Sequence, residues 1–174
     1  MNVDTLLKRY ASGERDFSNA ELSGANLEGV TFSGINLIRA NLSNARLKNS
    51  NLGGAFLVLA NLSGADLSKT ISIAVNFSGA NLKEANLSES KLIEAILTGT
   101  WLQRANLSKA NLQGAILAGA NLIQANLRKA DLRGANLYGA DLRQADLTDA
   151  MITHANLRGA NLEGVIMPDK VMAV

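Results

Sequence analysis

The chain has 174 residues, of which 47% are hydrophobic and only 4% aromatic. It contains 17 Lys and Arg and 15 Asp and Glu. This length suits one domain, and a net charge of +2 predicts neither a strong polyanion-binding surface nor an acidic one. The absence of cysteine excludes disulfides and thiolate metal sites. No apolar run approaches the roughly 18 residues of a membrane span, and no signal peptide is visible, so we expect a cytoplasmic protein.

The first predicted element is a short helix over residues 3–11. Asn2 can cap its N-terminus, and Gly13 follows its end. We expect one apolar face of this helix to cover the open end of the structure that follows, where core side chains and unpaired backbone would otherwise meet water. The residues close to that face are Leu6, Leu7 and Tyr10.

From Phe17 to Met167 the chain repeats every five residues without an insertion, which gives 31 pentads. With the central residue called i, position i is Leu in 25 pentads and position i−2 is Ala in 22. Position i−1 is Asn in 15 pentads and Asp in five, and position i+2 holds 13 of the 15 glycines. The consensus is therefore Ala-(Asn/Asp)-Leu-x-Gly.

Neither a helix nor a strand has this period. On a helix, steps of five would spread the Leu row over all faces, and on a strand every second Leu would face water. The period fits if each pentad makes one short extended piece and one corner, so that i and i−2 always point inward and the other positions point outward. Four such sides close a square coil of about 20 residues, and the coils stack at about 4.8 Å as a solenoid. Gly at i+2 suits a type II turn, and Asn at i−1 can bond nearby backbone or the Asn of the next coil.

On these repeats the chain resembles the pentapeptide-repeat proteins. The resemblance implies an all-β fold, a right-handed quadrilateral parallel β-helix, here of about eight square coils with a short N-terminal capping helix. We expect a helical cap at 1–14, the β-helix at 15–169 and a tail at 170–174. The segments LLKRYASGERDF and GVIMPDK resemble the terminal segments of cyanobacterial members. The core should contain, among other repeat centres, Leu22, Leu42, Leu62, Leu82, Leu107 and Leu132.

One centre breaks the inner row. Ser72 stands in the column of Leu52 and Leu92, where a small polar residue would leave a void. Two interpretations stay open: a tolerated defect of the repeat, or a bulge that re-aims side chains for recognition.

The outward positions suggest one candidate surface. Counting pentads in rotation gives four sides, and side one holds the pentads centred on Phe17, Leu37, Leu57 and every twentieth residue onward. Apolar residues replace Asn at i−1 on this side, beside a column of Gly at i+2 that should form a smooth strip. The predicted protein-binding residues are Phe56, Val58, Leu59, Ile96, Trp101 and Ile116, with Trp101 on the next side.

No enzyme or cofactor signature is present, so we predict a protein that is not an enzyme and has no cofactor. The single histidine, His154, has no partner at triad spacing, and no His or Cys cluster could hold zinc. A calcium site of aspartates is not favoured either. The residues considered for it are Asp141, Asp146 and Asp149.

Two functions remain. The first is a non-enzymatic scaffold that binds a protein partner of unknown identity. For a partner that docks on side one, a second copy of this chain is one alternative. The second, known in the family, is DNA mimicry against a type II topoisomerase, which the charge of +2 disfavours. The resemblance also implies homodimerisation through the C-terminal end as one alternative. Nucleic-acid binding is not favoured, because solvated charge explains the basic residues Arg104, Lys109, Arg128, Lys129 and Arg133.

Overall fold

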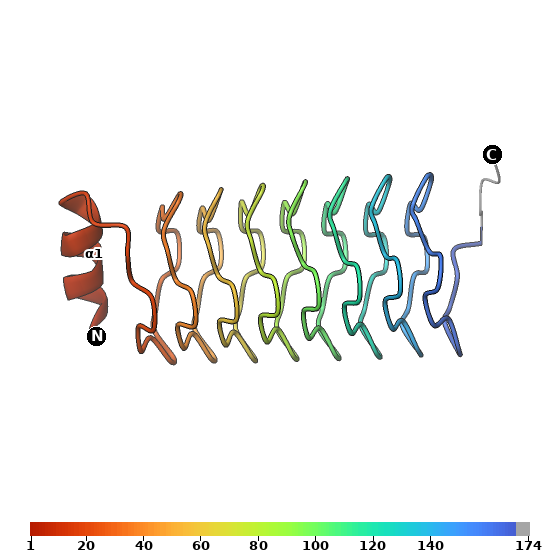
Figure 1. The fold of residues 1–174 in the computed structure, drawn as a ribbon, viewed down its shortest axis with the longest axis horizontal. Helices are drawn as coiled ribbons and strands as arrows, with labels where there is room; N and C mark the ends of the chain where they lie inside the picture. Colours follow the sequence, from red (N-terminus) through yellow and green to blue (C-terminus); the bar gives the residue numbers. More distant parts are fainter. Residues whose placement is uncertain (170–174) are drawn as a thin grey trace.

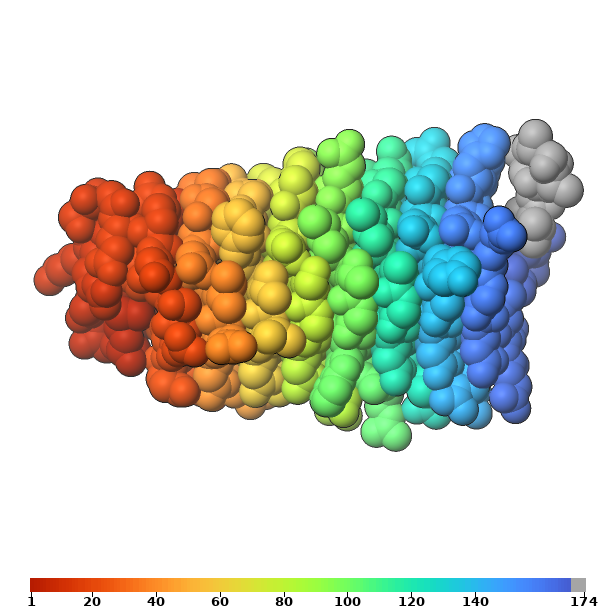
Figure 2. Space-filling view, viewed as in Figure 1, coloured from red at the N-terminus to blue at the C-terminus, as the bar shows by residue number. Residues whose placement is uncertain are grey.

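A computed structural model describes residues 1–169, which form a rod in which the chain winds as a stack of coils behind one short helix (Figure 1). The space-filling view shows the successive coils in contact along the rod (Figure 2). The helix α1, Val3–Ala11, lies at the N-terminal end of the rod, where the sequence predicts it. The proposed tail at 170–174 lies outside the described residues. Among residues 1–169 no helix combines the length and the apolar character needed to cross a membrane, and the cytoplasmic location stays a prediction.

The coils are joined by parallel bridges between residues 20 positions apart. Asn86, for example, bridges to Asp66 in one neighbouring coil and to Asn106 in the other. These contacts are single-residue bridges between short extended pieces, and each piece is followed by a turn. A register of 20 equals four pentads, so one turn of the coil takes four sides, as the five-residue period predicts.

The pentad around Leu107 shows how the backbone is satisfied. The N–H of Leu107 donates to the carbonyl of Asn126 in the next coil at 2.7 Å, and the N–H of Lys109 donates to Arg128 at 2.9 Å. The N–H of Asn106 donates back to Ala85 in the preceding coil at 2.9 Å. Ala110 closes the turn by donating to the carbonyl of Leu107 itself at 3.0 Å, so main-chain bonds satisfy four of the five N–H groups.

Each corner is a turn whose i+2 residue has a left-handed backbone. Gly119 has a φ of 64°, as the type II turn requires. Residues with side chains adopt the same conformation at other corners, including Glu89 and Lys109, both with a φ of 58°. This conformation costs a non-glycine residue roughly 1–2 kcal/mol, so the bonds between coils hold it against its own preference.

The core is the column of inward residues at i and i−2. All six repeat centres singled out from the sequence are buried, and together with the small alanines they fill the interior from coil to coil. The i+1 residues point outward, but the sequence overstates their exposure. Most are half-buried and Ser68 is buried, because the neighbouring coils stand close on both sides.

Helix α1 closes the N-terminal end of this core. Leu6 is fully buried in the core cluster, and Val3 and Tyr10 pack against it. Leu7 is 37% exposed, so the expectation that it covers the first coil is wrong, because the inward stripe follows the spacing of Val3, Leu6 and Tyr10. The hydroxyl of Tyr10 donates to the carbonyl of Ser33 at 2.8 Å.

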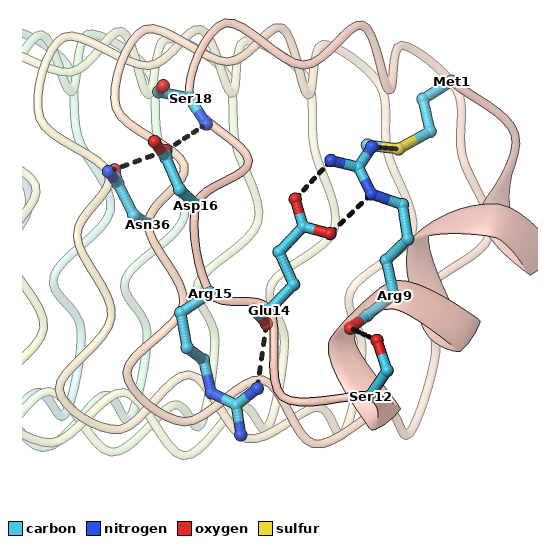
Figure 3. Close-up of polar contacts among 8 residues, drawn as sticks. All are labelled: Met1, Arg9, Ser12, Glu14, Arg15, Asp16, Ser18 and Asn36. Carbon is cyan, nitrogen blue, oxygen red and sulfur yellow. Dashed lines mark hydrogen bonds and ion pairs between the residues drawn. The ribbon is translucent and has the colours of Figure 1, made fainter.

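Polar contacts hold the segment after α1 in place (Figure 3). Arg9 forms a two-pronged ion pair with Glu14, in which its Nε donates to Oε2 at 2.7 Å. The guanidinium of Arg15 lies 4.0 Å from the centre of the Tyr10 ring and donates to the Tyr10 carbonyl at 2.9 Å. These contacts fix the helix against the first coil.

The coil around Ser72 keeps the regular register. Ile71 bridges to both Asn51 and Lys91, and the N–H of Ser72 donates to the carbonyl of Lys91 at 2.8 Å. The side chain of Ser72 is fully buried, and its hydroxyl donates to Oγ1 of Thr70 at 3.1 Å. This regular ladder supports the interpretation of Ser72 as a tolerated defect, because a bulge would interrupt it.

Replacing Leu107 with Ala should lower the free energy of unfolding by about 2–5 kcal/mol, because it leaves a cavity in a closely packed interior. Replacing it with Asp should prevent the neighbouring coils from folding, because the charge would be buried without a partner. Urea denaturation followed by circular dichroism measures both. A Leu107→Asp protein as stable as the parent would contradict the packing described here.

Replacing Ser72 with Leu should raise the melting temperature, since it fills the inner row and removes a hydroxyl from the core. Thr70 keeps its own bond to the carbonyl of Leu67 at 2.9 Å, so the change leaves that hydroxyl satisfied. Thermal unfolding of the variant beside the parent is the measurement. A lower melting temperature would mean that the interior at this level has no room for the larger side chain.

Candidate protein-binding surface

Side one carries two of its apolar residues in direct succession. Ile96 bridges to Ile116 in the next coil, whereas Phe56 is separated from Ile96 by the coil of Asn76. Phe56 is 47% exposed, Ile116 is also exposed and Ile96 is half-buried. The structure therefore brings Ile96 and Ile116 together and places Phe56 two coils from Ile96.

The glycine column beside these residues is open over only part of its length. Leu59 lies over the next coil, so that a Cβ built on Gly79 would stand 2.8 Å from the Cδ2 of Leu59. At Gly99, Gly119 and Gly139 an added Cβ would meet nothing within 4 Å. The smooth strip predicted from the sequence is thus covered by Leu59 at its first glycine and open at the following three.

Trp101 stands on side two, one side further along the coil, and is 51% exposed. The ammonium group of Lys83 lies 4.5 Å from the centre of its ring, a cation–π contact between neighbouring coils. A shallow hollow lies on the same side. It is lined by Lys83, Glu84, Gln103, Arg104, Ile123 and Gln124.

Sequence reasoning missed three exposed apolar residues near this surface. Ile71 and Ile73 belong to side four, which meets side one at a corner, and Tyr138 is an i+1 residue of side one that is 59% exposed. Ile71 replaces Asn at i−1, as Ile96 does, so the same signal was present on another side. Tyr138 occupies a position whose residues vary freely, and the repeat gives no signal there.

The role of Asn and Asp at i−1 is visible in their hydrogen bonds. Every Asn and Asp at this position between Asp16 and Asn161 accepts, through Oδ1, the N–H of its own i+1 residue at 2.9–3.4 Å. Figure 3 shows this bond from Ser18 to Asp16. This is the fifth N–H of the pentad, the one that the main chain leaves over, so the side chain caps the backbone.

Many of these side chains also form ladders between coils. The Nδ2 of Asn106 donates to Oδ1 of Asn86 at 3.2 Å, and Asn126 donates to Asn106 at the same distance. The ladders explain why short amides dominate i−1. A short amide can both cap its own pentad and bond the next one.

Apolar residues at i−1 leave that N–H without an acceptor. Within residues 1–169 no acceptor is found for the N–H groups of Val58, Thr98 and Ala118, which follow Phe56, Ile96 and Ile116. The N–H of Gln103, two residues after Trp101, also has no acceptor among the described residues. The candidate surface therefore combines apolar side chains with uncapped backbone donors.

The same N–H groups stabilise charged carboxylates where the cap is Asp. The backbone N–H of Ser18 is the main reason that the pKa of Asp16 lies below its usual range. At Asp131 the side chain of Arg133 is the leading cause of a lowered pKa, and the backbone N–H of Arg133 adds to it. Both aspartates are therefore charged at neutral pH.

Several of the residues considered for metal and nucleic-acid binding form ion pairs. Asp141 pairs with Arg143 at 2.8 Å, and Asp146 pairs with Arg128 at 3.0 Å. Arg133 of the basic group is paired with Asp131. In the part of the chain that the structure describes, no three His, Cys, Asp or Glu side chains are grouped as metal ligands.

Comparison with known proteins gives the family. The sequence profile of the family described as Pentapeptide repeats matches in eight copies over residues 16–54, 40–71, 73–108, 105–144 and 130–167. The chain belongs to the pentapeptide-repeat family. It has no significant match among curated proteins.

Solved structures similar to this pentapeptide-repeat protein include two from the cyanobacterium Nostoc. HetL, which is involved in heterocyst differentiation regulation, is 33% identical over 97% of this chain and 98% of its own, with a TM-score of 0.37. The protein alr5209 is 32% identical over 95% of both chains, with a TM-score of 0.23. QnrB1, a plasmid-mediated fluoroquinolone resistance protein, is 22% identical over 88% of this chain and 82% of its own, with a TM-score of 0.71. The family and the likeness to QnrB1 give a right-handed β-helix, as predicted.

Replacing Asn106 with Ala should destabilise this pentapeptide-repeat protein by about 0.5–1.5 kcal/mol, because it leaves the N–H of Ser108 uncapped and interrupts a ladder. Amide hydrogen exchange at Ser108 should become faster while exchange at Leu107, bonded within the main chain, stays slow. Unchanged exchange at Ser108 would show that the cap contributes nothing.

Proposed function

We propose that this protein is a non-enzymatic scaffold, a rod of about eight square coils between a helical cap at 1–14 and a tail at 170–174. Members of the family are generally structural or interaction proteins. The rod would bind a protein partner through an apolar surface centred on side one. That surface comprises Phe56, Val58, Leu59, Ile96, Trp101 and Ile116.

One observation carries this proposal. On a surface where short amides and carboxylates cap the backbone, three i−1 positions of side one hold large apolar residues, and the N–H that follows each of them has no acceptor within residues 1–169. Exposed carbon surface is unfavourable in water, and a partner that buries it can also accept from these N–H groups. A rigid rod also loses little conformational entropy on binding, so a narrow strip can support a specific contact.

DNA mimicry receives little support from the charges. The acidic belt of one coil consists of Glu84, Glu89 and Glu94, but Glu84 lies 3.6 Å from Arg104 and Glu89 lies 3.9 Å from Lys69. A mimic needs a continuous negative face, and here neighbouring cations interrupt it. A gyrase supercoiling assay separates the two functions, since a scaffold leaves supercoiling unchanged.

We also propose homodimerisation through the C-terminal end. The inner row there is less covered than at the N-terminus, because Ile152 and Leu157 are half-buried and Leu162 is 38% exposed. At the other end α1 leaves Phe17 and Leu22 buried. Sedimentation equilibrium of the full chain decides between monomer and dimer.

The triple change Phe56→Asn, Ile96→Asn and Ile116→Asn tests the role of side one. Each change restores the residue that the repeat prefers, so folding should survive and the melting temperature should not fall. A partner captured from native lysate by the parent protein should be lost. Met151→Asn, which changes an exposed apolar i−1 residue on side four, is the matched control and should retain the partner. Equal capture by the triple variant would refute the proposal.

A further inference from the structure

Two uncapped donors lie next to each other at the corner between sides one and two. Thr98 and Ala118 occupy the same position in neighbouring coils, and because Ile96 and Ile116 precede them, neither N–H has an acceptor within residues 1–169. Equivalent groups in stacked coils are about 4.8 Å apart and point the same way. The flanking positions differ, because Asn76 caps Ser78 and Asn136 caps Tyr138.

The surroundings of this pair combine apolar walls with open space. Ile96 and Ile116 border it on side one, and Trp101 stands beyond the corner on side two. Between them the corner is formed by Gly99 and Gly119, where no side chain fills the space. Another chain can therefore approach the backbone closely at this point.

The chain itself shows which acceptor such an N–H binds. Asp16 accepts the N–H of Ser18 at 3.1 Å, and that bond is the main reason that the pKa of Asp16 is lowered. The two oxygens of one carboxylate are about 2.2 Å apart, so a single carboxylate can accept from two parallel N–H groups at the coil spacing.

We infer that the N–H groups of Thr98 and Ala118 form a carboxylate-binding site, filled by an aspartate or glutamate side chain from an apolar segment of the partner protein. This inference rests on the proposed function and names the chemistry of the partner. Ile96, Ile116 and Trp101 contact the apolar neighbours of that acidic residue.

The site asks for a carboxylate that a second copy of this chain does not bring to it. Two-fold symmetry would place the same patch of both copies together, and the residues of that patch, Ile96, Thr98, Ile116 and Ala118, include no Asp or Glu. We therefore assign the acidic residue to a different protein.

The nearby charges are mixed and leave a positive group on the Trp101 side. Lys83 lies over Trp101, while Arg104 and Glu84 are close enough to offset each other. Glu94 stands at the other corner of side one, separated from Thr98 by Ile96. The ammonium of Lys83 thus favours an anion on the side where the donors are exposed.

The test uses the full-length protein labelled with nitrogen-15 and the peptide acetyl-Ser-Leu-Asp-Leu-Ser-amide, with the peptide carrying Ala in place of Asp as control. The acidic peptide should shift the amide resonances of Thr98 and Ala118 and slow their hydrogen exchange. The Ala peptide should bind at least about tenfold more weakly, since charge-assisted hydrogen bonds are lost. Equal binding of the two peptides, or unmoved Thr98 and Ala118 resonances, would overturn the inference.

Two double variants separate the donors from the apolar walls. Ile96→Asn with Ile116→Asn supplies an internal cap to both N–H groups, and binding should fall at least about tenfold. Ile96→Gln with Ile116→Gln is equally polar but should leave the donors uncapped, because Glu21, one methylene longer than Asp, does not cap the N–H of Ser23. The Gln variant should therefore still show the Thr98 and Ala118 shifts, and Met151→Asn should bind as the parent does.

The outcomes distinguish the two proposals. If the triple Asn variant loses its partner from lysate while the acidic peptide fails to bind the parent, side one is the interaction surface and the carboxylate site is wrong. If the acidic peptide binds the parent and the Asn double variant equally, the uncapped donors play no part and the inference is overturned.

Discussion

The main-chain hydrogen bond between residues of adjacent coils is the interaction on which this structure depends. Each pentad of the inner coils makes three such bonds, two forward and one back, and they repeat in the same register along the rod. They account for the left-handed backbone of residues such as Lys109, which would avoid it in isolation. Stability is consequently a property of stacked neighbours, since a single coil has no partner for any of these groups.

The residue types of the repeat follow from the interior space and the N–H group that the main-chain hydrogen bonds leave unfilled and unpaired. The interior admits a Leu and a small residue per pentad, and the remaining N–H requires a short acceptor such as Asn106. The repeat is therefore a solution to two problems at once, filling a narrow interior and completing the backbone hydrogen bonds. Departures such as Ser72 and Ile96 disturb one of these requirements without breaking the register.

The sequence predicts much of this fold because the period of five is incompatible with helices and strands, and because its inward and outward positions carry different residues. The N-terminal helix was also predictable from Asn2 and the residues after it. The cap made by Asn at i−1 was foreseen only in outline, since the identity of the leftover N–H depends on the turn geometry. The exposed Tyr138 and the position of Leu59 over Gly79 could not be predicted, because side-chain direction at a corner is set by neighbouring coils.

The helical cap has a further consequence for how copies of this protein can associate. A rod with two uncovered ends can add subunits head to tail without limit and grow into a fibre. Here α1 lies across the N-terminal end of the rod and buries Leu6, so the helix stands where another copy would have to stack on the first coil (Figure 1). The proposed dimer through the C-terminal end would accordingly stop at two copies, because both of its outer ends would carry the helix. The short helix therefore acts as a chain terminator, which protects a highly regular and otherwise self-complementary architecture from fibrillar growth.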